Sequence, residues 1–139
     1  PRLLLHTENN KRFDTVVDTF GLCSVEDPIL ALRTAQAACV HPTSSRILLL
    51  EHGRSYFSWI NHHLDKYAAK HLQKWGCSWN RDILQIVKDA GLIIESSSRW
   101  HFGTTYLIIA RPNPDFVSPA TTPNTAAVSS SSKFSSAVE

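Results

Sequence analysis

The residues of this chain best suited to chemistry follow two apolar runs. Thr19-Phe20-Gly21 comes after the first run, and Glu51-His52 ends the second. Glycine lets a backbone approach a ligand closely, and an imidazole that titrates near neutral pH can remove a proton from a reacting group. These residues are therefore candidates for a binding crevice, with His52 as a candidate general base. The alternative is that Gly21 only forms a turn and His52 only bonds to backbone.

Two parallel strands joined by a helix are predicted to bring these candidates together. The first strand ends near Thr19, a helix begins at Asp27-Pro28 and runs to about Val40, and the second strand covers residues 46–51. Aspartate is a good N-cap, and proline is favoured in the first helical turn. Such a βαβ unit ends both strands at one sheet edge, where open α/β sheets bind ligands. The apolar runs also predict burial on both faces of each strand.

Residues 55–75 are predicted to form a helix that is unusually aromatic and basic. Its side chains could cover an apolar substrate or contact a membrane surface through lysines that face lipid headgroups, or they could pack against the sheet. Together with Glu51 and His52, three residues near its start are candidates to face a substrate: Arg54, Tyr56 and Trp59.

The chain continues with a helix capped by Asn80 and stopped at Gly91. Two β-rich runs follow at residues 92–102 and 104–111, and their connection at Gly103 is too short for a crossover, so they must be antiparallel. Two tryptophans are expected to fill core space between helix and hairpin: Trp79 and Trp100.

Composition limits the function. The 139 residues fit one domain, and a net charge of +2 with scattered basic residues gives no support for nucleic-acid binding. The three cysteines are widely separated, which fits a reducing compartment, and Cys39 is expected to be a core thiol. No metal site is expected, because a set of four residues lacks the spacing of zinc ligands: His62, His63, His71 and Cys77.

Composition changes after Pro112. Residues 113–139 are rich in serine, threonine and proline and have too little apolar content to offset the entropy of ordering, so they are expected to be disordered. No apolar run approaches the roughly 20 residues that span a bilayer. The expected division is a partial domain over residues 1–112 and a disordered tail over 113–139.

Several blocks of sequence resemble a known family: Phe13 to Leu22, Ala31-Leu32-Arg33, Ile47 to Glu51, Glu51 to Arg54, Lys74 to Asp82 and Arg99 to Tyr106. The order of elements is similar to the C-terminal half of a class I S-adenosylmethionine-dependent methyltransferase, whose Rossmann-like α/β sheet ends in an antiparallel hairpin. The first three blocks resemble the ubiquinone/menaquinone C-methyltransferase family. The blocks that contain tryptophan look like fungal mitochondrial methyltransferase-like proteins.

The resemblance implies S-adenosylmethionine as cofactor, with Thr19, Phe20 and Gly21 beside its methionine part. It implies transfer of a methyl group to a small acceptor, which an aromatic cover would suit if the acceptor is lipophilic, and a mitochondrial rather than general intracellular location. The family's Gly-x-Gly loop and its first strands have no counterpart here, since the five glycines stand singly. The chain is therefore expected to be a fragment, inactive by itself, that lacks the N-terminal half of its domain.

Two alternatives remain at this point. The chain could be a non-catalytic truncated product or an assembly protein that pairs with a partner through an open sheet edge. A nicotinamide-dependent dehydrogenase shares the parallel sheet but does not predict the terminal antiparallel hairpin.

Overall fold

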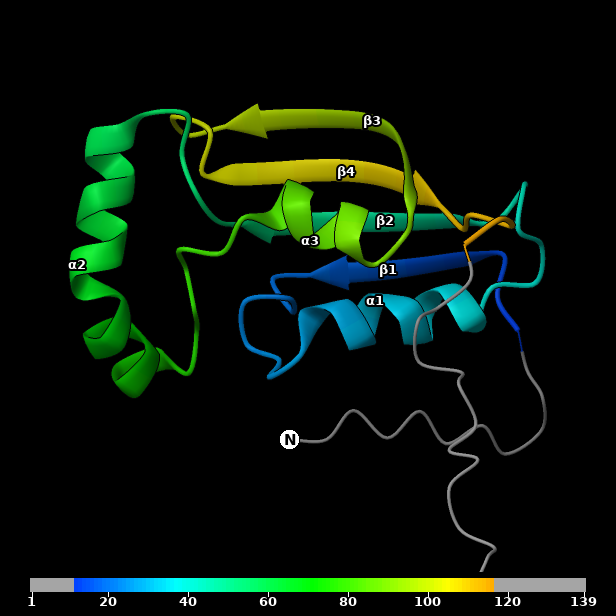
Figure 1. Cartoon of the computed structure of the whole chain (residues 1–139), viewed down its shortest axis with the longest axis horizontal. Coiled ribbons are helices and arrows are strands. Elements are labelled where there is room, and N and C mark those ends of the chain that lie inside the picture. Colours follow the sequence, from blue (N-terminus) through cyan, green and yellow to red (C-terminus); the bar gives the residue numbers. More distant parts are fainter. Residues whose placement is uncertain (1–11, 117–139) are drawn as a thin grey trace, which may run out of the picture.

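The computed structural model describes residues 12–116, and in this part of the chain the strands form one sheet with the order β1-β2-β4-β3 (Figure 1). The disorder predicted for the tail concerns residues that lie almost wholly outside the described range. Along the chain the elements are β1 (Thr15–Thr19), α1 (Pro28–Ala37), β2 (Arg46–His52), α2 (Ser58–Trp75), α3 (Ile83–Asp89), β3 (Ile93–Trp100) and β4 (Thr105–Arg111).

The strand pairing confirms the predicted βαβ unit and terminal hairpin. β1 and β2 are parallel, in a register that runs from Thr15 opposite Arg46 to Thr19 opposite Leu50. β4 lies between β2 and β3 and is antiparallel to both. The mixed α/β sheet therefore has parallel strands at one side and a hairpin at the other, as expected for the C-terminal half of a Rossmann-like methyltransferase domain.

Local signals explain where the first two helices begin and end. Asp27 Oδ1 accepts a hydrogen bond from the Leu30 amide at 2.9 Å, as predicted, and Pro28 occupies the first turn. α1 ends at Ala37, a little before the predicted end at Val40, because the chain turns to pair Cys39 with Phe13. α2 ends at Gly76, whose φ of 66° is easily adopted by glycine.

The start of α3 corrects the sequence prediction. Its cap is Asp82, whose side chain accepts from the Gln85 amide at 3.1 Å. Asn80, the predicted cap, instead donates its side-chain amide to Asp65 on α2 at 2.9 Å. Both residue types cap helices well, and the tertiary contact decides between them. Gly91 ends this segment as predicted.

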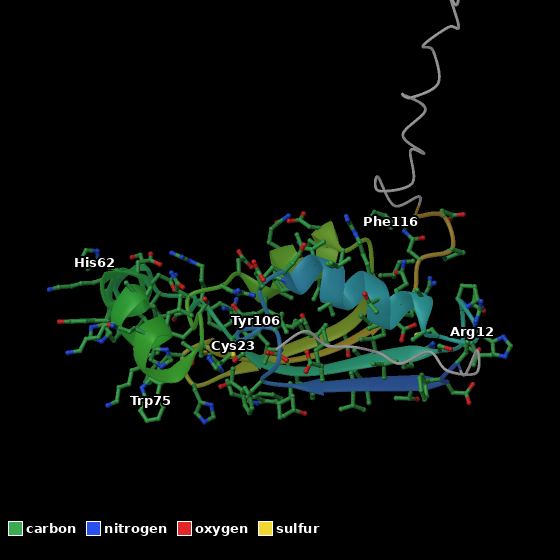
Figure 2. The ribbon with its side chains drawn as sticks, turned by 90° about the horizontal axis from the view of Figure 1, so that it is seen from below. Arg12, Cys23, His62, Trp75, Tyr106 and Phe116 are labelled. Carbon is green, nitrogen blue, oxygen red and sulfur yellow. The ribbon has the colours of Figure 1, made fainter. Side chains whose placement is uncertain are left out.

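Helices α1 and α3 pack against one face of the sheet (Figure 2). Between them lies a core of fully or nearly fully buried apolar side chains: Leu22, Leu32, Cys39, Ile47, Leu49, Ile83, Val87, Ala90, Leu92, Tyr106, Ile108 and Ala110. The prediction that Cys39 is a core thiol is thus confirmed.

The opposite face of the sheet is not covered by the described helices. Burial alternates along β2, and Val17 on β1 is 65% exposed. The prediction that both strands are buried on both faces is therefore wrong within residues 12–116, because α1 and α3 lie on the same face. The less buried face carries a row of apolar side chains in register: Val17, Leu48, Leu50, Leu107 and Ile109.

Helix α2 stands beyond the carboxyl ends of β1 and β2 (Figure 1). None of its residues is buried, and only a half-buried stripe that includes Ile60 and Leu64 faces the rest of the chain. The expected core role is wrong for Trp100, which is 47% exposed because the end of the hairpin projects beyond α3. None of the described helices has the length and hydropathy needed to cross a bilayer.

Truncation of Leu49 tests the core assignment. Leu49→Ala is expected to lower the free energy of unfolding by about 2–4 kcal/mol, because Leu49 is fully buried and its loss leaves a cavity. The same change at Leu30, which is 60% exposed on α1, is expected to cost less than about 1 kcal/mol. Urea denaturation measures both values, and equal losses would contradict this account of the core.

Candidate functional site

The ends of β1 and β2 meet as predicted. The Phe20 amide donates to the Leu50 carbonyl at 2.8 Å, which continues the parallel ladder one residue past Thr19. The Gly21 amide then donates to Glu51 Oε1 at 3.1 Å. The turn after β1 is therefore held by the end of β2. A Cβ atom at Gly21 would require the Asp18 carboxylate to shift.

Glu51 is a fully buried carboxyl group on the helix-covered face of the sheet. Burial, followed by the nearby negative charge of Asp18, raises the pKa of Glu51 to about 7. Its second oxygen, Oε2, has no hydrogen-bond partner among the described residues. Glu51 thus acts as an internal support for the turn at Gly21 and is sensitive to pH near neutrality.

His52 projects from the other face, because successive side chains of a strand alternate. Glu51 and His52 therefore leave the strand on opposite sides, yet the charge of Glu51 also raises the pKa of the Cys77 thiol that lies beside His52, so the expectation that they face one crevice stays a prediction. His52 Nε2 lies 3.0 Å from Cys77 Sγ, and its ring packs 5.5 Å from the ring of Phe20. Burial, with the neighbouring His71 as a second cause, lowers the pKa of His52, which favours the neutral imidazole.

A cluster of metal-ligand types surrounds His52. The sulfur atoms of Cys23 and Cys77 and a ring nitrogen of His52 all lie within 4.8 Å of one another. Both cysteines are buried and reduced. Burial and the adjacent Cys23 raise the pKa of the Cys77 thiol to about 12. Sequence reasoning missed this cluster, since the three residues lie in separate segments with no motif spacing to connect them.

Arg81 fixes the loop that carries Cys23. Its guanidinium donates to the carbonyls of Leu22 at 2.6 Å and Val25 at 2.8 Å. Its own carbonyl accepts from the Arg54 amide at 3.0 Å and lies so close to Gly53 that a Cβ atom there would collide with it. One residue thus joins the loops that follow β1, β2 and α2.

The three histidines whose spacing argued against a zinc site do not come together in the structure. His62 and His63 are exposed on α2, and the ring of His63 packs against Tyr67. His71 Nδ1 lies 2.9 Å from the Cys77 carbonyl oxygen, and its ring stacks on Trp79 at 3.9 Å. His71 therefore positions the Cys77 loop, and the ligand types gather at a different set of residues from those that the sequence suggested.

The remaining substrate-facing candidates lie apart from this cluster. Arg54 forms a two-point ion pair with Asp65 on α2 at 3.0 and 2.9 Å. Tyr56 packs under the Arg99 guanidinium at 4.0 Å, and Trp59 is 68% exposed on α2. Each of these contacts has a structural role, and Trp59 is the candidate with most of its side chain free for an external contact.

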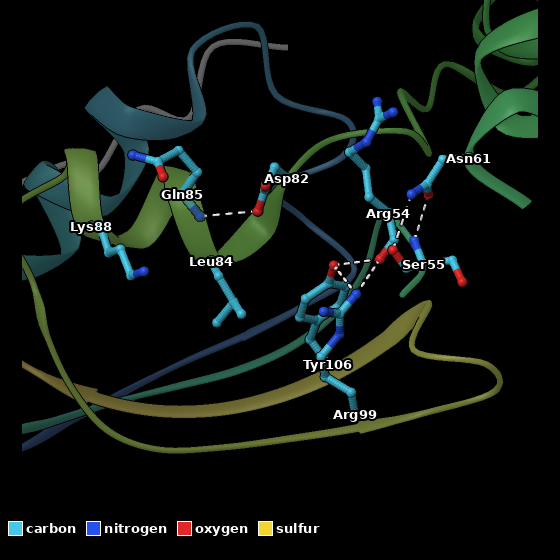
Figure 3. Close-up of a pocket in the computed structure, with 9 residues that line it drawn as sticks. All are labelled: Arg54, Ser55, Asn61, Asp82, Leu84, Gln85, Lys88, Arg99 and Tyr106. Atoms are coloured by element: carbon cyan, nitrogen blue, oxygen red, sulfur yellow. Dashed lines mark hydrogen bonds between the residues drawn. The ribbon is translucent and has the colours of Figure 1, made fainter. Parts of the chain in front are cut away.

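Two cavities border the site. Figure 3 shows a small polar one of about 280 Å³ between α3 and the hairpin, where the Arg99 guanidinium and the Tyr106 hydroxyl both donate to the Arg54 carbonyl. The other is an open cavity of about 930 Å³ between the loop after β1, the start of α1 and the end of α2. Cys23, Gly76, Ser78 and Arg81 are among its lining residues. The second cavity therefore adjoins the cluster around His52.

Comparison with known proteins places this site in context. No family model matches the chain. The protein named methyltransferase OMS1, mitochondrial, of Saccharomyces cerevisiae is 42% identical over 115 residues, which is 83% of this chain. The chain spans only 24% of that relative's length.

A solved structure supports the fold. The crystal structure of TnmH superposes with a TM-score of 0.54 at 21% identity, over 72% of this chain and 30% of that one. At this identity the likeness shows the fold alone, whereas the yeast relative supplies the functional family. By sequence and fold, the chain belongs to the class I S-adenosylmethionine-dependent methyltransferases and corresponds to the C-terminal part of their domain.

Proposed function

We propose that this chain forms one wall of the active site of a mitochondrial methyltransferase that transfers a methyl group from S-adenosylmethionine to a small, lipophilic acceptor. The observation that supports this most is the turn after β1. Thr19-Phe20-Gly21 lies at the carboxyl end of two parallel strands and is held there by Glu51, in a chain that is 42% identical over 115 residues to a mitochondrial methyltransferase. Ligands of open α/β sheets bind at such ends.

The residues present suit the cofactor's methionine part. Thr19 is exposed and Phe20 is 44% exposed, so their side chains are accessible at this turn, whose backbone amides at Phe20 and Gly21 are bonded to Leu50 and Glu51. In the described residues, β1 pairs on one side only, with β2. S-adenosylmethionine would supply an electrophilic methyl group, and Thr19, Phe20 and Gly21 would hold the end of the molecule that carries it.

The other wall is proposed to come from an upstream segment that contains a glycine loop. The free side of β1 and the apolar row that includes Val17 and Leu107 offer a place for further strands and helices. Parallel sheets are normally covered on both faces. The 139-residue chain by itself is therefore proposed to be inactive, because it holds only part of the cofactor site.

His52 is proposed to position the acceptor or to accept a proton from it. Methyl transfer is a displacement at carbon, so alignment of the acceptor can suffice when the acceptor is already nucleophilic. A neutral imidazole could also remove a proton from an acidic acceptor. His52 faces away from Glu51, so its chemistry would take place on the sheet face that α1 and α3 leave open.

A non-catalytic role is the second candidate. The observation in its favour is the side of β1 that pairs with no strand within residues 12–116, which could add a strand from another chain. An S-adenosylmethionine-binding measurement on a longer protein separates the two candidates, because an assembly protein has no need to bind the cofactor.

The first experiment compares two threonines of β1 in a protein that includes the upstream coding sequence. Thr19→Val is expected to raise the Kd for S-adenosylmethionine about 3- to 10-fold through the loss of one hydrogen bond. Thr15→Val, at the far end of the same strand, should leave it unchanged. Isothermal titration measures both. Micromolar binding to residues 1–139 alone would contradict the divided site.

Glu51 predicts a pH dependence of stability. Its folded-state pKa near 7 exceeds the ordinary value of 4.5, so between these values the folded chain holds a proton that the unfolded chain releases. The free energy of unfolding should therefore fall by roughly 1–3 kcal/mol as the pH rises from about 4.5 to 8. Glu51→Gln keeps an acceptor for the Gly21 amide and should remove this decline.

The matched control is Glu26→Gln, because Glu26 is exposed on the loop before α1. Urea denaturation at about pH 5 and pH 8 gives the free energies for wild type and both variants. If Glu51→Gln shows the same decline as wild type, Glu51 is not the group responsible.

The lysines of helix α2 lead us to expect that it binds an anionic membrane surface, where a lipophilic acceptor would reside. Lys66, Lys70 and Lys74 lie on one exposed stripe of α2 together with Trp59. Replacing the three lysines by glutamine is expected to lower the partition coefficient for anionic vesicles, measured by sedimentation, by roughly 10- to 100-fold. Lys88→Gln on α3 should change it less than about threefold. Equal binding of all variants would exclude α2 as the contact.

A further inference from the structure

The cluster of Cys23, His52 and Cys77 is assembled from three separate segments. Cys23 belongs to the loop after β1, His52 ends β2, and Cys77 follows α2. Their candidate ligand atoms are the two sulfurs and a ring nitrogen, all within 4.8 Å of one another. One of these separations, from His52 Nε2 to Cys77 Sγ, is 3.0 Å.

These separations are close to those of a tetrahedral metal centre. Zinc bonds of about 2.3 Å to sulfur and about 2.0 Å to imidazole nitrogen place neighbouring ligand atoms roughly 3.5–3.8 Å apart. The observed separations, 3.0 Å for one pair and none above 4.8 Å, bracket this spacing. Zinc prefers thiolate and imidazole ligands, whereas magnesium and calcium prefer oxygen ligands.

Backbone contacts hold the three segments in place. The Ser78 amide donates to the Cys23 carbonyl at 2.8 Å, so the two cysteine loops are bonded directly to each other. His71 Nδ1 meets the Cys77 carbonyl, and Arg81 holds the carbonyls on both sides of Cys23. The ligand loops are thus fixed by contacts that do not involve the ligand atoms themselves.

Charge and access also suit a divalent ion. Two thiolates and a neutral imidazole cancel the charge of Zn²⁺, so a neutral centre would form at a site where both cysteines are buried. The open cavity of about 930 Å³ reaches Cys23, Gly76 and Ser78 and gives the ion a path from solvent. Because the centre carries no net charge, its burial avoids the free-energy cost of placing an unpaired charge inside the protein.

We propose that Cys23, His52 and Cys77 bind one zinc ion beside the ends of β1 and β2, with a fourth position left for water or another exogenous ligand. Three protein ligands and one open position are the pattern of catalytic rather than structural zinc. On binding, each thiol loses its proton to solvent as a zinc–sulfur bond forms, so no oxidant or reductant is needed. The proposal concerns this chain's own residues and does not require that the methyltransferase proposal be correct. When His52 binds zinc, its ligating ring nitrogen cannot accept a proton from a methyl acceptor, so the two roles of His52 exclude each other.

The test is a metal titration of the 139-residue chain in a phosphine reductant, with Co²⁺ as a spectroscopic probe and Zn²⁺ as its competitor. We expect one equivalent of Co²⁺ to give thiolate-to-metal charge-transfer absorption and the visible bands of a tetrahedral ion, and one equivalent of Zn²⁺ to abolish them. The variants are Cys23→Ser, Cys77→Ser and His52→Gln. Cys39→Ser is the matched control, because Cys39 is buried at the opposite end of β1.

The affinity should fall at least tenfold in each ligand variant and by less than threefold in Cys39→Ser, since even supporting contacts around metal ligands are worth roughly 10- to 100-fold. Zn²⁺ should also raise the thermal midpoint of wild type and Cys39→Ser but not of the ligand variants. If the chain folds only when it binds metal, circular dichroism replaces the thermal midpoint as the measurement. It should then show structure induced by Zn²⁺ in wild type and Cys39→Ser but not in the ligand variants.

Several results would overturn the proposal. These are no binding at one equivalent, a cobalt spectrum without thiolate absorption, and an equal loss of affinity in Cys39→Ser. A Cys23–Cys77 disulfide that the phosphine fails to reduce, seen as a mass two hydrogens below that of the reduced chain, would assign the pair to redox chemistry instead. S-adenosylmethionine is absent throughout, so failure here leaves the cofactor experiment unaffected.

Discussion

The two-point hydrogen bond from Arg81 to the loop after β1 is the contact on which the candidate site depends. A loop that leaves a parallel strand has no ladder to hold it, and the guanidinium replaces that ladder with two charged donors at Leu22 and Val25. The Arg81 backbone is fixed in turn by Arg54 and by the absence of a side chain at Gly53. A lysine in this position could not make both contacts in one plane. The loops that carry Cys23 and Cys77 are therefore joined through Arg81.

The secondary structure was largely predictable because its signals are local. Asp27-Pro28, Gly91 and the short link at Gly103 each fix a boundary by a backbone requirement that the sequence displays. The parallel pairing of β1 and β2 followed from the length of the crossover alone. Where two local signals competed, as at Asn80 and Asp82, a contact with Asp65 on another helix decided the outcome.

The site was predictable only where it lies on the strands. Thr19, Phe20, Gly21 and Glu51 converge because register follows from pairing. The opposite directions of Glu51 and His52 were also contained in the sequence, since strand residues alternate. Cys23 and Cys77 could not be placed, because their contact depends on where α2 returns the chain. No sequence pattern near either cysteine indicates where that cysteine lies in the fold.

Alternation along β2 has a consequence for how the site can work. Glu51 lies on the helix-covered face and supports the backbone at Gly21, whereas His52 lies on the open face beside both cysteines. Support and chemistry thus come from the same strand end but from opposite sides of the sheet. A change in the protonation of Glu51 can reach His52 through the turn at Phe20, whose ring packs on the His52 ring, and through the Cys77 thiol, whose pKa is raised in part by the charge of Glu51. The carbonyl of Phe20 accepts from the Cys23 thiol at 3.3 Å, so the turn joins the proposed cofactor-binding residues to the cysteine cluster.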